Sequence, residues 1–317
     1  MSLSHRRTLL ALGLGCLVVI TLSMTLGARG SWSFVLPFRA TKLFVICLVA
    51  HAVGVSTVLF QTLSGNRILT PAVMGFDALF LMLQTALFLL LGSFQVTSLP
   101  GWAIFVLQVA AMGSFAALLY RRLFTGSAQS LHMMILVGIV LGTLFRSLAN
   151  YLQSLIDPNE FLVLQGRLFA NFNNADPSAL GISALVIAAS TTAVILRLPR
   201  FDVIGLGRER AINLGLDYRR EMTFGLALIG VLVSVSAALV GPVTFFGLLV
   251  AHLAYRLLPT HRHAVVLPAV SMIAIMALLI GQFVLERVFS FGAALSMVIE
   301  FGGGILFLFL LLRGAAR

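Results

Sequence analysis

The sequence has few charged residues and only two cysteines, and each scarcity excludes a class of protein. Charged residues make up 10% of the 317 residues and hydrophobic residues 60%, whereas a soluble domain carries about 25% charged residues. This composition therefore excludes an ordinary soluble domain. Cys16 and Cys47 both lie in apolar runs, which argues against a disulfide framework or a thiolate metal site.

Motifs for catalysis and nucleotide binding are also missing. There is no GxxxxGKS or GxxxxGKT phosphate loop, and the one lysine, Lys42, does not follow a glycine-rich loop. Five histidines lie without metal-ligand spacing to a partner, and we expect them to have packing or surface roles: His51, His132, His252, His261 and His263. We therefore expect no cofactor, no bound metal and no enzymatic activity of the chain itself.

Long continuous apolar runs are what the sequence does have. Each is about 20 residues, the length that crosses the hydrocarbon core as a helix, and none alternates as a barrel strand does. We predict an all-α polytopic membrane protein, a single domain over residues 1–317, with ten spans. They are 8–28, 43–63, 73–92, 102–120, 131–152, 178–197, 222–240, 244–258, 264–285 and 295–312; the eighth is short and could be re-entrant, so the count has an error of one.

The net charge of +11 does not indicate nucleic-acid binding, because the basic residues lie in short loops between spans. If both termini lie on the same side, fifteen basic residues fall on that side and five on the other, and Arg146 lies inside a span. The positive-inside rule then places both termini and the loop 197–221 in the cytoplasm. The five outer residues are Arg29, Arg39, Lys42, Arg167 and Arg287. The outer segment 153–177 is expected to be a solvated loop with a short surface helix.

The segment 205–215, GLGRERAINLG, is the most informative stretch of the loop 197–221. Two glycines open it, a turn of helix with charged side chains follows, an apolar contact comes next, and a glycine ends it. We predict a short amphipathic helix that forms a docking surface. Its residues are Gly205, Gly207, Arg208, Glu209, Arg210, Ala211, Leu214 and Gly215.

Charged residues inside the predicted spans are costly in lipid and should face the bundle interior or an interface. They are Asp77, Arg146 and Glu300, and Asn150 lies one turn from Arg146 on the same helix face. A polar stripe along a translocation path and structural polar contacts between helices remain equally good interpretations. The GxxxG of Gly138 and Gly142 is interpreted as a packing device.

Several motifs, in order along nearly the whole chain, resemble the FecCD-type permease subunits of bacterial ABC importers for iron–siderophore and cobalamin. LGRERAINLGL resembles the family's LGEERAxxLG. GPVTFFGLLVAHLAYRLL (241–258) resembles its GPIxFxGLxxPHxxRLL. Gln61, Asn66, Pro71 and Gly75 keep its QxxxxNxxxxPxxxG spacing.

The resemblance implies the type II importer fold, ATPase contact at the loop 197–221, and binding-protein contact at Arg39, Lys42 and Arg287. It further implies a second permease chain, two copies of an ABC ATPase, and a periplasmic or lipid-anchored substrate-binding protein. We therefore expect a multi-pass permease of the bacterial inner membrane that imports ferric siderophore by alternating access. The alternatives are the same machine carrying cobalamin or haem, and an ion-coupled secondary transporter.

The chain departs from the family's motifs at several places. Asn66-Arg67 stands for Asn-Pro, Ala251-His252 for Pro-His, and Gly302-Gly303-Gly304 for Gly-x-Pro. These departures resemble the branch whose members work as one of two different permease chains, for catechol-containing siderophores. They favour a heterodimer over a homodimer.

Overall fold

The structure is a computed structural model that describes residues 3–26, 31–125, 131–173, 176–287, 295 and 297–305. Every regular element in these ranges is helical. The elements are α1 (Leu3–Thr25), α2 (Trp32–Ser64), η1 (Pro71–Met74), α3 (Phe76–Ser98), α4 (Gly101–Thr125), α5 (Leu131–Gln153), α6 (Pro158–Leu168), α7 (Pro177–Ile195), α8 (Leu198–Ile204), α9 (Arg208–Asn213), α10 (Tyr218–Val240), α11 (Phe246–Leu257) and α12 (His263–Arg287).

Eight helices in the described ranges are long and apolar enough to cross a membrane: α1, α2, α3, α4, α5, α7, α10 and α12. This confirms the all-α polytopic class. Helix α11 has 12 residues and reaches only about 18 Å at 1.5 Å per residue, short of a core about 30 Å thick. Part of the expected last span, residues 296 and 306–312, lies outside the described residues, so the count of ten stays a prediction.

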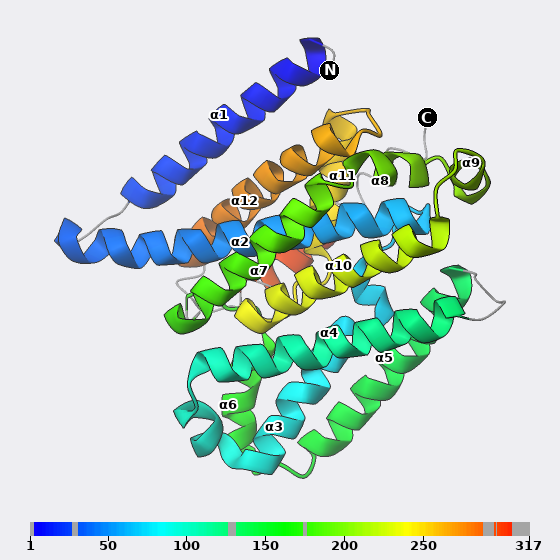
Figure 1. Cartoon of the computed structure of the whole chain (residues 1–317). Helices are drawn as coiled ribbons and strands as arrows, with labels where there is room; N and C mark the ends of the chain where they lie inside the picture. Colours follow the sequence, from blue (N-terminus) through cyan, green and yellow to red (C-terminus); the bar gives the residue numbers. More distant parts are fainter. Residues whose placement is uncertain are drawn as a thin grey trace.

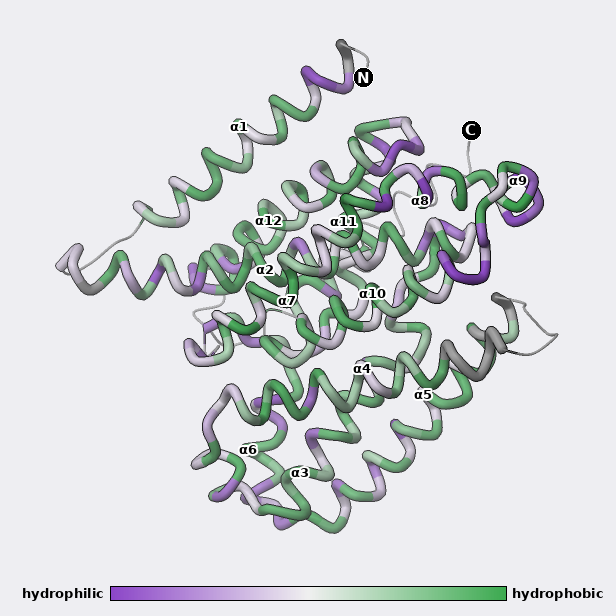
Figure 2. The backbone as a smooth tube through the Cα atoms, viewed as in Figure 1, coloured by the Kyte–Doolittle hydropathy of each residue, from purple (hydrophilic) through white to green (hydrophobic). Residues whose placement is uncertain are grey.

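The helices form two groups that run roughly side by side (Figure 1). One group holds α2, α7, α10 and α12, with α1 along its edge; the other holds α3, α4, α5 and α6. Helix α4 packs along α10 and joins the groups. The start of α1 and the short helices α8 and α9 lie at one end of the bundle, and α6 lies at the other. Hydrophilic residues concentrate in the α8–α9 region and the loops, while the long helices are mostly hydrophobic (Figure 2).

Helix α2 is longer than the sequence predicted. It begins at Trp32 rather than at residue 43, and Pro37 lies inside it instead of ending it. A proline in the second turn removes only one intrahelical hydrogen bond. The helix can therefore continue through it. A second difference is α8, which the sequence analysis did not predict; Gly205 caps its C-terminus and does not open α9.

The GxxxG motif of α5 packs against the η1 turn, as predicted. A Cβ built on Gly138 would lie 2.8 Å from Cα of Met74, and one built on Gly142 would lie 3.1 Å from Cα of Gly75. Gly75 itself has φ 82°, a conformation that favours glycine. The motif spacing that ends at Gly75 therefore serves a close backbone contact between η1 and α5.

Polar side chains inside the bundle bridge helices. His51 of α2 lies 2.8 Å from the Thr191 hydroxyl of α7 and 2.9 Å from the Ser271 hydroxyl of α12. Hydrogen bonds of this kind satisfy polar groups where no water is available. His51 therefore has the packing role expected from the sequence.

Candidate docking surfaces at the two ends of the bundle

A glycine with positive φ lies at each end of helix α9. Gly207 precedes it with φ 99° and ψ 162°, a region that only glycine enters without strain. After it, the Gly215 N–H donates to the Ile212 carbonyl and the Leu216 N–H to the Ala211 carbonyl. This pair of bonds is a Schellman motif, which terminates helices at a left-handed glycine. The predicted short helix between these glycines is confirmed.

The outer surface of α9 mixes charge with apolar area. Arg208, Glu209 and Arg210 are exposed, and Ala211 is buried against the rest of the chain. Leu214 is 64% exposed, so its apolar surface is free to meet a partner. Exposed apolar area rimmed by polar residues marks interaction sites.

Helix α8, which carries α9, is held to the bundle by a buried carboxylate. Glu221 at the start of α10 is 3% exposed and accepts two bonds from Arg197, at 3.0 and 2.9 Å, and one from Arg200. The Arg197 guanidinium also lies 3.7 Å from the centre of the Phe224 ring, a cation–π contact. The α7–α8 junction is thereby fixed to α10.

A second anchor joins α8 to α12 and α2. The Asp202 carboxylate accepts from the His263 backbone N–H at 2.8 Å and lies 2.6 Å from His263 Nδ1. His263 Nε2 lies 2.8 Å from the Thr62 hydroxyl. Partial burial alone would raise the pKa of Asp202, but the His263 contacts and the charge of Arg262 outweigh it and lower this pKa. His263 is thus a structural residue, which its sequence position in a basic loop did not reveal.

Through these two anchors, α8 contacts α10 and α12 directly and α2 by way of the His263 ring. Helix α9 follows α8 closely along the chain. Three membrane-crossing helices are therefore tied to one short exposed helix.

The three residues predicted to bind an external partner gather at the other end of the bundle. Arg39, Lys42 and Arg287 all line a cavity of about 350 Å³ between the end of α1 and helices α2 and α12. Arg39 donates to three carbonyls at the end of α1, those of Ser23, Met24 and Leu26, each at 3.0 Å. Arg287 is exposed.

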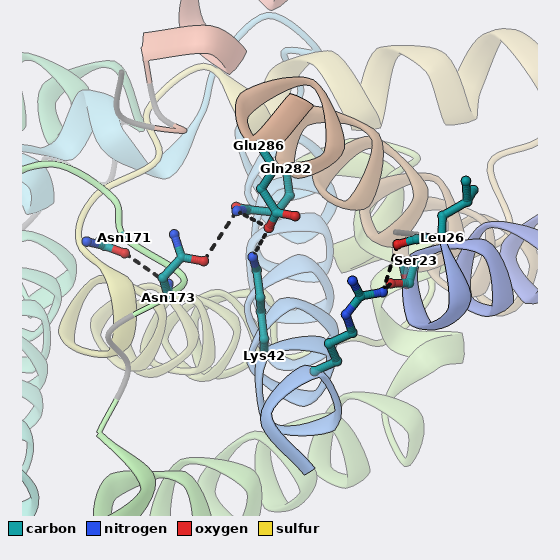
Figure 3. Close-up of polar contacts among 8 residues, drawn as sticks. Ser23, Leu26, Lys42, Asn171, Asn173, Gln282 and Glu286 are labelled. Atoms are coloured by element: carbon teal, nitrogen blue, oxygen red, sulfur yellow. Dashed lines mark hydrogen bonds and ion pairs between the residues drawn. The ribbon is translucent and has the colours of Figure 1, made fainter. Parts of the chain in front are cut away.

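Lys42 has a partner within the chain. Its ammonium pairs with Glu286, which also accepts from Gln282 at 2.9 Å, and Gln282 donates to Asn173 at 3.3 Å (Figure 3). The Lys42 side chain is only 14% exposed. The sequence analysis overlooked Glu286, although it lies one turn from Gln282 and beside Arg287.

Within the membrane, the structure brings two of the predicted polar residues together. The Thr244 hydroxyl donates to Asp77 at 2.8 Å and also interacts with Glu300. Arg146 and Asn150 instead lie on the exposed face of α5, although Arg146 is near enough to attract Asp77 electrostatically. Among the described residues, no group of three or more His, Cys, Asp or Glu side chains could hold a metal ion.

Comparison with known proteins gives a consistent picture. The profile of the FecCD transport family matches residues 8–313. The chain is 43% identical over 285 residues to the petrobactin import system permease protein YclO of Bacillus subtilis (strain 168), covering 90% of each. It is 26% identical to the vitamin B12 import system permease protein BtuC of Klebsiella pneumoniae, covering 98% of this chain and 95% of that one.

A solved chain described as a metal-chelate type ABC transporter in an inward-facing conformation has the same fold. It superposes with a TM-score of 0.85 at 20% identity, covering 98% of this chain and 99% of that chain.

Proposed function

Because this chain belongs to the FecCD transport family, we propose that it carries ferric siderophore across the bacterial inner membrane. It is a multi-pass permease subunit of an ABC importer, a transport component rather than an enzyme, and it works with an ATPase and a substrate-binding protein. The observation that carries the cargo proposal is the 43% identity, over 90% of both chains, to a petrobactin permease.

Helix α9 is the proposed contact with the ATPase. This short helix presents an exposed charged face and the exposed side chain of Leu214, and a glycine bounds it at each end. Closure of the ATPase pair on ATP would move α9, and the anchors at Glu221 and Asp202 would carry that movement into α10, α12 and α2. The bundle then shifts between two packings, as in other rigid-body transitions.

The proposed assembly has a second, different permease chain and two ATPase copies. Arg146 and Asn150 support a partner on the outer face of α5, because a charged side chain exposed to lipid is costly. This face, with Asp77 and Glu300 near it, is the proposed wall of the translocation path. The chain acts as one domain over residues 1–317, with both termini in the cytoplasm.

The binding protein is proposed to dock at the end of the bundle that holds Arg39, Lys42 and Arg287. Charges at the rim of an interface steer and orient a partner more than they tighten the complex. Arg287 is the most accessible of the three, whereas Lys42 would exchange its contact with Glu286 for one with the partner.

The second candidate cargo is cobalamin, favoured by the similarity to vitamin B12 permeases over 98% of this chain. The test is uptake of radiolabelled iron as ferric siderophore in iron-starved cells. The gene is deleted, then restored as wild type or as Gly207→Pro. We expect loss on deletion, rescue by wild type, and no rescue by the variant at equal membrane abundance. Unchanged iron uptake on deletion, in a strain without redundant systems, would point to cobalamin or haem.

A further inference from the structure

A polar cavity lies inside the chain at the same end of the bundle as the cavity of Arg39 and Lys42, but it is separate from that cavity, from α9 and from the outer face of α5. Its volume is about 340 Å³, at the lower end of the range for ligand pockets, about 300–1,000 Å³. It opens where the ends of α3, α6 and α10 meet the starts of α4 and α7. Its polar lining includes Gln84, Gln108, Arg167, Asn171 and Asp176.

Two glutamines in this lining each have one side-chain amide atom without a hydrogen-bond partner among the described residues. Gln84 is 5% exposed and Gln108 is 2% exposed. The Gln84 carbonyl oxygen and the Gln108 amide nitrogen are both buried without a partner in the described part of the chain. Buried polar groups are costly to leave unpaired, so the cavity offers a donor and an acceptor to a polar occupant.

The same cavity holds an arginine without a counter-charge. Arg167, at the end of α6, is half-buried over the Phe88 ring, 5.8 Å from its centre. No described carboxylate lies within ion-pair distance of it. Asp176 lines the cavity, but it caps α7 by accepting from the Ser178 N–H at 2.8 Å. Burial lowers the pKa of Arg167, which is the sign of an uncompensated cation.

An apolar groove continues from the cavity. It has a volume of about 100 Å³ and is lined by Leu87, Leu91, Val96, Leu99, Ala103, Ile104 and Leu107, so it shares Leu99 and Ile104 with the cavity. Helix α3 is kinked here at Gly92, with φ 76°. Glu160 holds the kink by accepting from the Ser93 N–H at 3.1 Å and its hydroxyl at 3.2 Å.

We propose that the cavity binds the headgroup of an anionic phospholipid whose headgroup carries hydroxyls, of the phosphatidylglycerol type, and that the groove receives one acyl chain. The guanidinium of Arg167 matches a phosphate, which accepts two parallel N–H bonds. The glycerol hydroxyls supply the donor that Gln84 lacks and the acceptor that Gln108 lacks. A plain carboxylate has no hydroxyl, and a choline headgroup has no donor.

The position also fits a lipid. The cavity lies at the ends of membrane-crossing helices, which is the level of the headgroups, and the groove runs from there along α3 and α4 toward the hydrocarbon core. Leu99 and Leu107 are exposed on the surface of the chain. A lipid held there would bridge the two groups of helices, the one that holds α3, α4 and α6 and the one that holds α7 and α10.

The test uses the full-length chain, purified in detergent with the subunits that co-purify with it. Native mass spectrometry measures the binding of phosphatidylglycerol, of phosphatidylcholine with the same acyl chains, and of glycerol phosphate alone. The variants are Arg167→Gln, the pair Gln84→Leu and Gln108→Leu, and Ala103→Phe, which fills the groove. Arg6→Gln, which removes an exposed charge near the start of α1 at the other end of the bundle, is the matched control.

We expect phosphatidylglycerol to bind more tightly than phosphatidylcholine, and Arg167→Gln to weaken it about tenfold, because a charge-assisted bond is lost. Ala103→Phe should weaken lipid binding but not glycerol phosphate binding. Equal binding of the two lipids, or no effect of Arg167→Gln, would overturn the proposal. Glycerol phosphate binding as tightly as the lipid would assign the site to a free phosphate ester. If no ligand binds, and if the pair Gln84→Leu and Gln108→Leu raises the thermal stability, the cavity holds only water and the proposal is overturned.

Discussion

The Asp202 carboxylate lies 2.6 Å from Nδ1 of His263, although the two residues are 61 positions apart. The contact joins the short helix α8 to the first turn of α12. On the other side of the ring, the Thr62 hydroxyl donates to the Val58 carbonyl at 3.0 Å, so it can accept from His263 Nε2. The imidazole therefore contacts Asp202 through one ring nitrogen and Thr62 through the other, and it holds α8, α12 and α2 together.

Asp202→Asn should loosen this contact. The pKa of Asp202 is lowered in the folded chain, so its stabilisation is present above the unfolded-state value of about 3.9. It is lost as the pH falls below that value through the folded pKa. We expect the variant to unfold at lower temperature at neutral pH, by roughly 1 kcal/mol, and to differ less from wild type below about pH 4.

Thermal unfolding followed between pH 3 and 7 measures this. Asp157→Asn is the control, because Asp157 caps α6 and asparagine caps equally well. A constant difference between Asp202→Asn and wild type at every pH would contradict the assignment.

Glu221→Gln should destabilise the α7–α8 junction. The substitution removes the charge that Arg197 and Arg200 share in a buried site, and we expect a loss of about 1–3 kcal/mol. Glu209→Gln, in the same loop but exposed, should change stability by less than about 0.5 kcal/mol. Equal unfolding temperatures for the two variants would show that the buried pair does not anchor α8.

Gly207→Ala should misdirect α9, whereas Gly205→Ala should be tolerated. Gly207 has φ 99°, where a side chain is strained despite open space around it. Gly205 is in the helical region, and a Cβ there meets only ordinary contacts, the nearest at 3.4 Å. Of the two variants, only Gly207→Ala should lower the ATPase activity that is coupled to transport, when both are present in the membrane at equal abundance. Full activity of that variant would remove α9 as the coupling element.

Gly138→Ala should push η1 away from α5, because its Cβ would lie 2.8 Å from Cα of Met74. Overpacking of this kind costs about 1–3 kcal/mol. Gly113→Ala in α4 is the matched control, since a Cβ there meets nothing within 4 Å. The change in unfolding temperature should differ in sign or size between the two variants. An unfolding temperature of Gly138→Ala equal to that of wild type would show that η1 moves to accommodate the added Cβ.

Arg287→Glu should weaken stimulation of the ATPase by the binding protein more than Lys42→Gln does. Arg287 is exposed, whereas Lys42 is largely buried and already paired with Glu286. The measurement is ATPase stimulation at low ionic strength, where exposed ion pairs are strongest. Glu286→Gln frees Lys42 and should, if Lys42 docks, raise the affinity for the binding protein. Stimulation unaffected by Arg287→Glu would place the docking site elsewhere.

Local signals in the sequence predicted much of this protein. Apolar runs located the membrane helices, because a span must be about 20 residues long. Gly207 and Gly215 predicted both ends of α9, because a glycine conformation acts within one turn. The start of α2 was not predicted, because the apolar run gave a span from residue 43, whereas the helix begins at Trp32 and continues through Pro37 in its second turn.

The pairs that stabilise the site could not be read in the same way. Lys42 and Glu286 are 244 positions apart, and each alone is an ordinary charged residue near a helix end. Gln84 and Gln108 are unremarkable until packing leaves them facing one cavity.

The sequence by itself therefore determined the all-α membrane class, the approximate positions of the membrane-crossing helices and the short helix α9, since these follow from hydropathy and backbone preferences along the chain. Only the tertiary structure decided which charges meet, that Asp202 meets His263, and that Arg167, which forms no ion pair with a described carboxylate, lines one cavity with Gln84 and Gln108. Such contacts depend on the approach of helices far apart in sequence, and no local preference encodes that approach.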